Sequence, residues 1–494
     1  MVERGENIFL CAYSEYRSVY AELARKLKES RHARIHLYVN TAQDAAYYRD
    51  RYTDLFDTIT EANSLYATSR LPVSDTARVI SRARMYEDAL GITINQLAVR
   101  DRHLGRGFAP GGYRHPRSRI SEKSDYFQMI NGFTDALDFW QREIDDKQPV
   151  LILNGNHLLC VIAKTKTIPV RILMNARYQN YYYWAHNDYL ETPVLQRQFS
   201  NEPDSDDVLP FVQGRTGYLA IEEQLRQHRS YFNTIKKIFM MTLRSMYGHL
   251  RRYEKAKIYY WHENVAYLWR YCRIIRDMTS SRIPNLAMFK DMPFVFFPLS
   301  TEPERALQHL SPEYLFQLEA IITVARDLPA GVTLVVKEHF PAVGRRPRDF
   351  YNQITELKNV HFINMAERGL DVLKMARAVV TVSGSAGLEA AVLGKPVITF
   401  GRHNIYNVLP HVEVVNGMEL LHDRIAEFCD PSFDQHAAAR DGQRFLRALV
   451  KISFDLGAFT TVAPDKIEPE VIDVSFAALL DSLGWSDKNS APSS

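Results

Sequence analysis

The sequence predicts an α/β protein with two regions of parallel β-sheet and a basic helical segment between them. Three observations support this fold class. Short apolar runs alternate with helical patterns over the first 180 residues, the same alternation resumes at Pro293, and residues 221–280 show helical periodicity. Strands that alternate with helices are typical of parallel sheets whose faces are covered by helices. A chain of 494 residues is also too long for one ordinary core, which favours two or three domains.

The composition limits the class of protein. A net charge of +3 gives no reason to expect a nucleic-acid partner. The four cysteines, Cys11, Cys160, Cys272 and Cys429, form no C-x-x-C pair, which argues against a zinc cluster or disulfide framework and fits a reducing compartment. The apolar run near the N-terminus is too short for a signal peptide, and no uninterrupted apolar run is long enough to span a membrane. We therefore expect a cytoplasmic protein that touches a membrane only peripherally.

The first sheet region is predicted from strand-like runs. They are "NIFLCAY" (7–13), "ARIHLYVN" (33–40), "PVLILNGN" (149–156) and "IPVRILMNARY" (168–178). Residues 99–119 are rich in glycine and arginine and have little periodicity, so we expect a long loop there. Loops of this length in compact domains are usually functional or disordered.

Residues 221–280 combine helical periodicity with many aromatic residues and a basic excess. The plainer interpretation is two or three helices with basic outer faces and aromatic inner faces. The alternative is a basic, aromatic surface that docks on anionic lipid headgroups or on an acidic glycan.

The second sheet region is predicted to be a doubly wound domain. Its strand candidates are residues 293–300, 331–339, 360–364, 378–383 and 396–401, and residues 311–327 read as a helix. Ligands of such sheets bind outside the carboxyl ends of the strands. Polar residues follow four of these strands, and together they suggest a cleft. They are Ser300, Thr301, Glu302, Glu304 and Arg305, then Glu338 and His339, then Ser383, Gly384 and Ser385, then Arg402, His403 and Tyr406.

The turn Ser383-Gly384-Ser385 precedes a helical stretch that Gly394 should end. We expect Ser385 to be the N-cap of this helix, and Gly384 to let the backbone approach a ligand closely. Free amides at the start of a helix favour an anion such as a phosphate. An ordinary capped crossover helix would use the same residues. The stretch is neither a Walker A loop nor a G-x-G-x-x-G fingerprint.

Lys337 and His339 lie at the end of a predicted strand, so both are expected to reach its rim. A cation and an imidazole there could bind a diphosphate or assist a leaving phosphate, although a single histidine is also a common structural residue. In the glycine-arginine loop, Asp101 lies among Arg100, Arg102 and His103. Asp101 is a candidate general base or organiser of an anion site, with a solvated basic loop as the alternative. Glu15 and His186 are rival candidates for the base.

Three stretches of the C-terminal half resemble the capsule and surface polysaccharide biosynthesis glycosyltransferases, whose GT-B arrangement has two Rossmann-like domains facing a cleft. They are "FVFFPLSTEPER", "LPAGVTLVVKEHFP" and "VVTVSGSAGLEAAVLGKPVITFG", in the family's order and spacing. The resemblance covers residues 293–406 and does not extend through the helices at 221–280. In the first half, "RDRHLGRGF" lies where such proteins have an acceptor-side loop.

The resemblance implies a domain plan and site residues. Residues 1–200 would be a Rossmann-like acceptor-side domain, 201–288 a basic and aromatic helical segment, 289–460 the Rossmann-like donor domain, and 461–494 a C-terminal helix and loose tail. His339 matches the histidine of a histidine-proline motif near the donor phosphate, and Glu389 matches a glutamate that often holds the nucleotide ribose. Ser383 and Ser385 match the family's serine-containing phosphate loop. Together with the strand ends and the glycine-arginine loop described above, this completes the set of expected site residues. They are Arg305, Lys337, Ser383, Gly384, Ser385 and Glu389 for the donor, Asp101 and His339 for catalysis, and Glu15, Arg100, Arg102 and His103 on the acceptor side.

Two positions depart from the family pattern. Phe340 interrupts the histidine-proline pair, and Thr381 stands where related retaining transferases have a first glutamate, so the stereochemical outcome stays open. The expected activity is transfer of a sugar from a nucleotide-sugar, with CMP or UDP as the nucleotide, to a surface polysaccharide or lipid-linked glycan, without a cofactor or metal ion.

Two alternatives to the transferase stay open. "SGSAGLEAAVLGKPVI" also looks like part of the non-hydrolysing UDP-N-acetylglucosamine 2-epimerases, but their Gly-Thr-Arg-Pro-Glu motif is replaced here by "CAYSEYRS". The other alternative is a non-catalytic glycan-assembly module.

Overall fold

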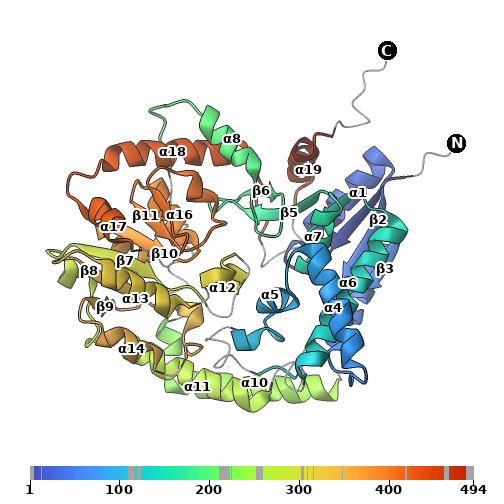
Figure 1. The fold of residues 1–494 in the computed structure, drawn as a ribbon, viewed down its shortest axis with the longest axis horizontal. Coiled ribbons are helices and arrows are strands. Elements are labelled where there is room, and N and C mark those ends of the chain that lie inside the picture. Colours follow the sequence, from blue (N-terminus) through green and yellow to red (C-terminus); the bar gives the residue numbers. More distant parts are fainter. Residues whose placement is uncertain are drawn as a thin grey trace. The chain divides into compact units, whose positions relative to one another are not determined.

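The protein is described by a computed structural model. The described residues are 5–12, 14–108, 117–119, 124–210, 223, 225–251, 260–301, 305–308, 310–314, 316–347, 349–417, 420–460 and 467–485. The chain forms two compact units. Unit 1 consists of Met1–Leu97, Ser124–Asn201 and Ala448–Ser494, and unit 2 consists of Ala98–Lys123 and Glu202–Arg447. Each unit is built on one sheet, so the α/β fold with two Rossmann-like parallel-sheet domains is confirmed (Figure 1).

The sheet of unit 1 has the order β13-β6-β5-β4-β1-β2-β3. Its strands are β1 (Asn7–Cys11), β2 (Arg34–Val39), β3 (Thr58–Glu61), β4 (Leu151–Leu153), β5 (Val170–Asn175), β6 (Tyr181–Ala185) and β13 (Phe454–Asp455). The pairs from β3 to β5 are parallel, whereas β6 and β13 are added antiparallel at one edge. Because β1 pairs with both β2 and β4, the strand order reverses direction between β1 and β4.

Helices connect the strands of unit 1. They are α1 (Arg17–Arg31), α2 (Ala42–Arg51), α3 (Ser64–Thr68), α4 (Thr76–Leu90), α6 (Tyr126–Lys147), α7 (His157–Thr165), α8 (Pro193–Asn201) and α19 (Pro469–Leu483), while α5 (Ile94–Val99) crosses from unit 1 into unit 2. The local sequence explains where several of these helices begin. Asp125 and Gln128 form a reciprocal capping box at α6, and Asn156 accepts from the Leu159 amide at the start of α7.

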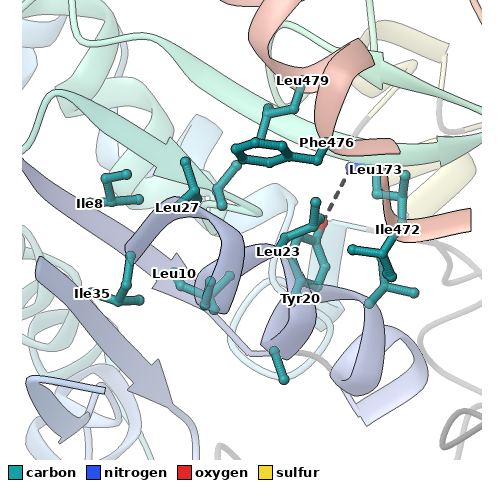
Figure 2. Close-up of a cluster of buried hydrophobic side chains, with 14 of the residues drawn as sticks. Ile8, Leu10, Tyr20, Leu23, Leu27, Ile35, Leu173, Ile472, Phe476 and Leu479 are labelled. Carbon is teal, nitrogen blue, oxygen red and sulfur yellow. Dashed lines mark hydrogen bonds between the residues drawn. The ribbon is translucent and has the colours of Figure 1, made fainter. Parts of the chain in front are cut away.

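The C-terminal helix α19 completes the core of unit 1 (Figure 2). Ile472, Phe476 and Leu479 lie in one buried cluster with Leu23 and Leu27 of α1. Each such side chain contributes about 1.5–3 kcal/mol of gross burial free energy, so α19 is part of this unit. This differs from the domain division expected from the sequence, in which residues 448–460 belonged to the donor domain and residues 461–494 formed a separate segment. Residues 486–494 of the expected loose tail lie outside the described residues.

The sheet of unit 2 has the order β12-β11-β10-β7-β8-β9, and every pair in it is parallel. Its strands are β7 (Phe294–Pro298), β8 (Thr333–Lys337), β9 (Val360–Phe362), β10 (Ala378–Thr381), β11 (Val397–Thr399) and β12 (Val412–Val414). The chain runs outward from β7 to β9 and then returns to β10 on the other side of β7. This is the doubly wound topology, with its switch point between β7 and β10.

The helices of unit 2 are α10 (Tyr231–Leu250), α11 (Trp261–Met278), α12 (Arg305–Gln308), α13 (Gln317–Asp327), α14 (Phe350–Glu356), α15 (Gly369–Met375), α16 (Ser385–Val392) and α17 (His422–Cys429), and α18 (Gln435–Lys451) continues into unit 1. The structure confirms the five strands that the sequence predicts in this half and adds β12. In the described part of the chain, no helix is both long and apolar enough to cross a membrane.

Helix α11 is packed onto the loop that follows β8. Tyr271 and Ile275 of α11 share a buried cluster with Val343 and Met365, and the rings of Tyr271 and Phe340 lie 5.8 Å apart. The Arg270 side chain also donates to the carbonyl of Gly344 at 2.9 Å. Helix α11 is therefore part of unit 2, and Phe340 is one of the residues on which it packs.

Candidate functional site

The candidate site lies at the carboxyl ends of β7, β8, β10 and β11 in unit 2. The loops after β7 and β10 leave the sheet on either side of the switch point, which is where doubly wound folds bind ligands. The hydroxyl of Ser300, after β7, donates to the backbone carbonyl of Ser383, after β10, at 3.0 Å. This hydrogen bond ties together two of the four polar strand ends that the sequence predicts.

Ser300 is held from two further directions. The amide of Gln317 pairs with both backbone groups of Ser300, accepting from its N–H at 2.6 Å and donating to its carbonyl at 3.1 Å. Arg346 donates to the same carbonyl at 2.8 Å. Because Gln317 and Arg346 are buried, the backbone after β7 is fixed before any ligand arrives.

A buried ion pair supports the end of β8. Glu338 and Arg346 have side chains that are each 1% exposed, and Arg346 donates to both carboxylate oxygens, at 2.7 and 3.0 Å. Tyr351 also donates to Glu338, at 2.7 Å. Burial acts to raise the pKa of Glu338, but Arg346 and these hydrogen bonds outweigh it and lower that pKa. The sequence placed Glu338 at a strand end but gave no signal for Arg346, which reaches it from beyond the next turn.

His339 and Lys337 differ from each other in the structure. His339 is accessible to solvent, yet desolvation by the surrounding protein, with smaller effects of Lys337 and Arg346, lowers its pKa to about 4. It is therefore neutral near pH 7 and can act as a hydrogen-bond donor or acceptor. Lys337 was expected at the rim, but its Nζ donates to the carbonyl of Met365 at 3.1 Å, on the β9 side of β8. Burial lowers the pKa of Lys337 to about 8.

The turn after β10 presents the start of α16 to solvent. Gly384, rather than the expected Ser385, is the N-cap, and no side chain caps the helix. Gly384 has φ 144°, a conformation that L side chains rarely adopt, and a Cβ there would meet open space. Ser385 is the first helical residue and is exposed, whereas Ser383 is buried. The amides at this helix start therefore face an open surface, as an anion site requires.

The remaining expected donor residues lie nearby in unit 2. Glu389 is on α16 and is buried, with 5% of its surface exposed. Tyr406 was expected at a rim, but it is buried against α16. Its hydroxyl oxygen lies so close to Gly387 that a Cβ at that position would be only 2.2 Å away. Arg305 begins α12. Glu302 and Glu304 lie outside the described residues.

The glycine-arginine loop belongs to unit 2 rather than to the N-terminal side as expected. Val99 accepts a hydrogen bond from Gln308 of α12 at 3.0 Å, so the segment is packed on the same unit as the donor candidates. One carboxylate oxygen of Asp101 accepts from the amides of His103 and Leu104, at 2.8 and 2.7 Å. Asp101 therefore stabilises a turn. Desolvation lowers the pKa of His103.

Unit 1 has a comparable constellation at its own switch point. Asn154, after β4, donates to the backbone carbonyl of Cys11, at the end of β1, at 3.0 Å. His157 directly follows the capping residue Asn156 and is the first residue of α7. Its Nδ1 lies 2.5 Å from Oδ2 of Asp188. Both side chains are mostly buried. An imidazole whose Nδ1 faces a carboxylate is held in one orientation, as in acid-base catalysis.

His157 and Asp188 were not among the site residues predicted from the sequence. A pattern that points to His157 is present, because Asn154, Asn156 and His157 follow a strand-like run in the same way as the polar residues of unit 2. Two expected residues of unit 1 lie elsewhere in its fold. Glu15 is exposed in a short 3-10 helix before α1, and desolvation lowers the pKa of His186, after β6, to about 4.

A cavity of about 800 Å³ lies at the opposite end of the unit 2 sheet. Pro293, Arg377 and Pro396, which directly precede β7, β10 and β11, line it together with Lys290 and Lys395. It is therefore distinct from the switch-point site.

Residues 215–409 match the family model described as capsule polysaccharide biosynthesis protein. The match confirms the resemblance seen over residues 293–406. It also corrects the expectation that the resemblance stops short of the helical segment, because it includes α10 and α11. Residues 1–214 lie outside the match. No curated protein matches the chain.

Several solved structures are similar to the chain. They include a putative UDP-N-acetylglucosamine 2-epimerase from Listeria monocytogenes (8% identity, 97% of this chain and 97% of that chain, TM-score 0.28), the calicheamicin glycosyltransferase CalG4 (12% identity, 97% and 99%, TM-score 0.28) and Anabaena HepE in complex with UDP and glucose (10% identity, 96% and 100%, TM-score 0.30). At these TM-scores the assignment of the fold rests on the strand orders of the two sheets.

Proposed function

From the family match over residues 215–409, we propose that this protein is a glycosyltransferase that moves a sugar from a nucleotide-sugar to a surface polysaccharide or lipid-linked glycan. The observation that carries the proposal is the hydrogen bond from Ser300 to Ser383 across the switch point, beside the uncapped start of α16. A rigid backbone next to free helix amides is suited to binding a diphosphate.

In the proposed mechanism, unit 2 binds the donor. The amides at Gly384 and Ser385 and the dipole of α16 stabilise the charge that develops on the leaving phosphate. His339, neutral near pH 7, contributes a hydrogen bond rather than a positive charge. Arg305 and Glu389 are retained as proposed donor contacts, to the phosphate and the ribose. Fixed dipoles and hydrogen bonds can replace a metal ion in this role, so turnover is proposed to be independent of divalent cations.

The proposed acceptor is bound by unit 1, and a base there removes the proton of the attacking hydroxyl. Asp101 was the expected base, but one oxygen of its carboxylate accepts from two backbone amides, and it lies in unit 2. We favour His157 instead, because Asp188 orients its ring and stabilises the imidazolium that forms on proton transfer. Arg100, Arg102 and His103 are retained as a proposed anion-binding loop, and Glu15 as an acceptor contact.

The second candidate is an epimerase that converts a nucleotide-sugar without an acceptor. Its supporting observation is the same uncapped start of α16, which is equally suited to the diphosphate of a nucleotide-sugar in an epimerase. A third, non-catalytic candidate would bind glycan without turnover. The proposed location is the cytoplasm, with peripheral contact at the inner face of the membrane, where a lipid-linked acceptor would be available.

A two-stage assay tests the proposal. Thermal-shift measurements with UDP, CMP, GDP and dTDP should show stabilisation by one nucleotide, with UDP and CMP favoured. Incubation with the matching nucleotide-sugars should then release the nucleotide only when a glycan acceptor is present, with EDTA making no difference. Formation of an epimer without acceptor would support the second candidate, and no shift with any nucleotide would exclude the transferase.

A further inference from the structure

Helix α10 exposes most of its large apolar side chains to solvent. Six of them follow one another at intervals of three or four residues, which places them on one stripe of the helix. We call this the α10 stripe, and its members are Phe232, Ile235, Phe239, Leu243, Met246 and Leu250. All are exposed, with values from 45% for Leu243 to 82% for Leu250.

The opposite face of α10 packs against the protein. Thr234 and Gly248 are the buried residues of this helix, and both are small. An amphipathic helix of a globular protein normally buries its apolar stripe, so α10 is inverted. This corrects the plainer expectation for α10, whose aromatic side chains were expected on an inner face, whereas Tyr271 of α11 is buried as that expectation has it. An exposed apolar surface of this extent marks an interaction site.

The charged side chains of α10 itself are of one sign. Helix α10 contains Lys236, Lys237 and Arg244 and has no aspartate or glutamate. Lys236 lies between Phe232 and Phe239 along the exposed side, and Arg251 follows the helix directly. Long basic side chains can keep their charges in a polar headgroup layer while their stems cover apolar surface. This pattern is complementary to an anionic, apolar-cored partner.

Aromatic residues with polar ends flank the stripe. Tyr231 of α10 stacks on Trp269 of α11 at 5.4 Å between ring centroids, and Trp261 donates to the hydroxyl of Thr242 at 2.9 Å. Both tryptophans remain partly exposed, at 47% and 44%. Tryptophan and tyrosine are favoured at the boundary between lipid headgroups and acyl chains.

We propose that α10, supported by α11, is a membrane-docking surface that lies in the plane of an anionic lipid bilayer with the α10 stripe in the acyl boundary. A helix of 20 residues is about 30 Å long and would contact the bilayer along its whole length. The exposed basic residues Lys236 and Arg244 bind the lipid phosphates, and the apolar stripe supplies the remaining affinity. The proposal rests on α10 and α11 alone and does not require that the protein be a transferase.

Vesicle co-sedimentation tests the proposal with the full chain. The protein should bind vesicles of phosphatidylcholine mixed with phosphatidylglycerol, bind vesicles of phosphatidylcholine alone more weakly, and lose part of its binding in high salt. The double variant Phe232→Glu/Phe239→Glu should weaken binding to the anionic vesicles by at least about tenfold. The double variant Lys236→Glu/Arg244→Glu should also weaken binding to the anionic vesicles by about tenfold or more, because it removes only the contacts with the lipid phosphates.

Matched controls keep the result specific. Ile322→Glu changes an exposed apolar residue on α13, and Lys358→Glu/Lys374→Glu reverses two exposed charges elsewhere in unit 2, so neither should alter vesicle binding. Circular dichroism establishes that each variant is folded, and a nucleotide thermal shift, measured without lipid, tests the donor site separately. Wild-type protein that fails to bind anionic vesicles would overturn the proposal. So would a stripe variant that turns a dimer into a monomer in light scattering, because a second copy would then cover the stripe.

Discussion

Ser300 and Ser383 join the ends of β7 and β10 through one side-chain hydrogen bond of 3.0 Å. Asn154 makes the corresponding connection in unit 1, from the end of β4 to Cys11 at the end of β1. Both bonds cross the switch point of a sheet. In each unit the backbone is therefore fixed at the place where a doubly wound fold binds its ligand.

Gly384→Ala tests the start of α16. Residues with a Cβ are strained at φ 144°, so the turn should rearrange and the affinity for the bound nucleotide should fall by about tenfold, as measured by isothermal titration calorimetry. The new methyl group itself would meet no neighbouring atom. Gly331→Ala is the matched control, because Gly331 also has a positive φ, of 86°, and open space, but precedes β8 at the other end of the sheet. If the two variants bind the nucleotide with equal affinity, the start of α16 is not part of the binding site.

Glu338→Gln tests the buried ion pair. The substitution leaves the Arg346 charge without a compensating carboxylate, so the free energy of unfolding should fall by about 3–5 kcal/mol in urea denaturation. Arg346→Met should cost a similar amount. The double variant Glu338→Gln/Arg346→Met should lose clearly less than the sum of the two single losses, since no unpaired charge remains. Additive losses would show that the two side chains are not energetically coupled.

His157→Gln tests the proposed base. Turnover should fall by about a hundredfold to ten-thousandfold, while the affinity for the nucleotide, which unit 2 is proposed to bind, should not change. Asp188→Asn should reduce turnover and shift the pH-rate profile, because the imidazolium loses its carboxylate partner. His186→Gln is the comparison variant on the same unit. If His186→Gln abolishes turnover and His157→Gln does not, the base is His186.

His36 should make unit 1 sensitive to acid. Its ring nitrogens lie 3.0 Å from Thr58 Oγ1 and from Asn7 Oδ1, and burial, helped by Lys147, lowers its pKa from 6.5 to about 4. Between these pH values His36 binds a proton in the unfolded chain but not in the folded chain. The contribution of His36 to the free energy of unfolding is therefore fully present above pH 6.5 and is lost as the pH falls toward 4. The loss attributable to His36 is roughly 3 kcal/mol. Urea denaturation at several pH values should show a shallower decline for His36→Gln, and an unchanged slope would contradict the assignment.

Local patterns in the sequence predicted much of the fold. The alternation of apolar runs and helices predicted both parallel sheets, and polar residues at strand ends predicted Ser300, Ser383 and Gly384 at one edge. Contacts between distant segments could not be predicted in this way. Arg346 reaches Glu338 because the chain turns back after β8. The segment that leads to Asp101 is held on unit 2 by the hydrogen bond from Gln308 to Val99 and by the packing of Val99 on the core. Periodicity likewise predicted helices at residues 221–280 but not the side of α10 that faces solvent.

Phe340, which interrupts the histidine-proline pair, makes two regions of the chain depend on each other for folding. Its ring lies against Tyr271 of α11, and the same loop gives Val343 to the shared cluster. Removing α11 would expose these apolar side chains to water and would also remove the hydrogen bond from Arg270 to Gly344. We therefore expect hydrogen exchange to find α11 and residues 340–344 opening as one cooperative unit, so that neither segment can be transplanted into another protein without the other.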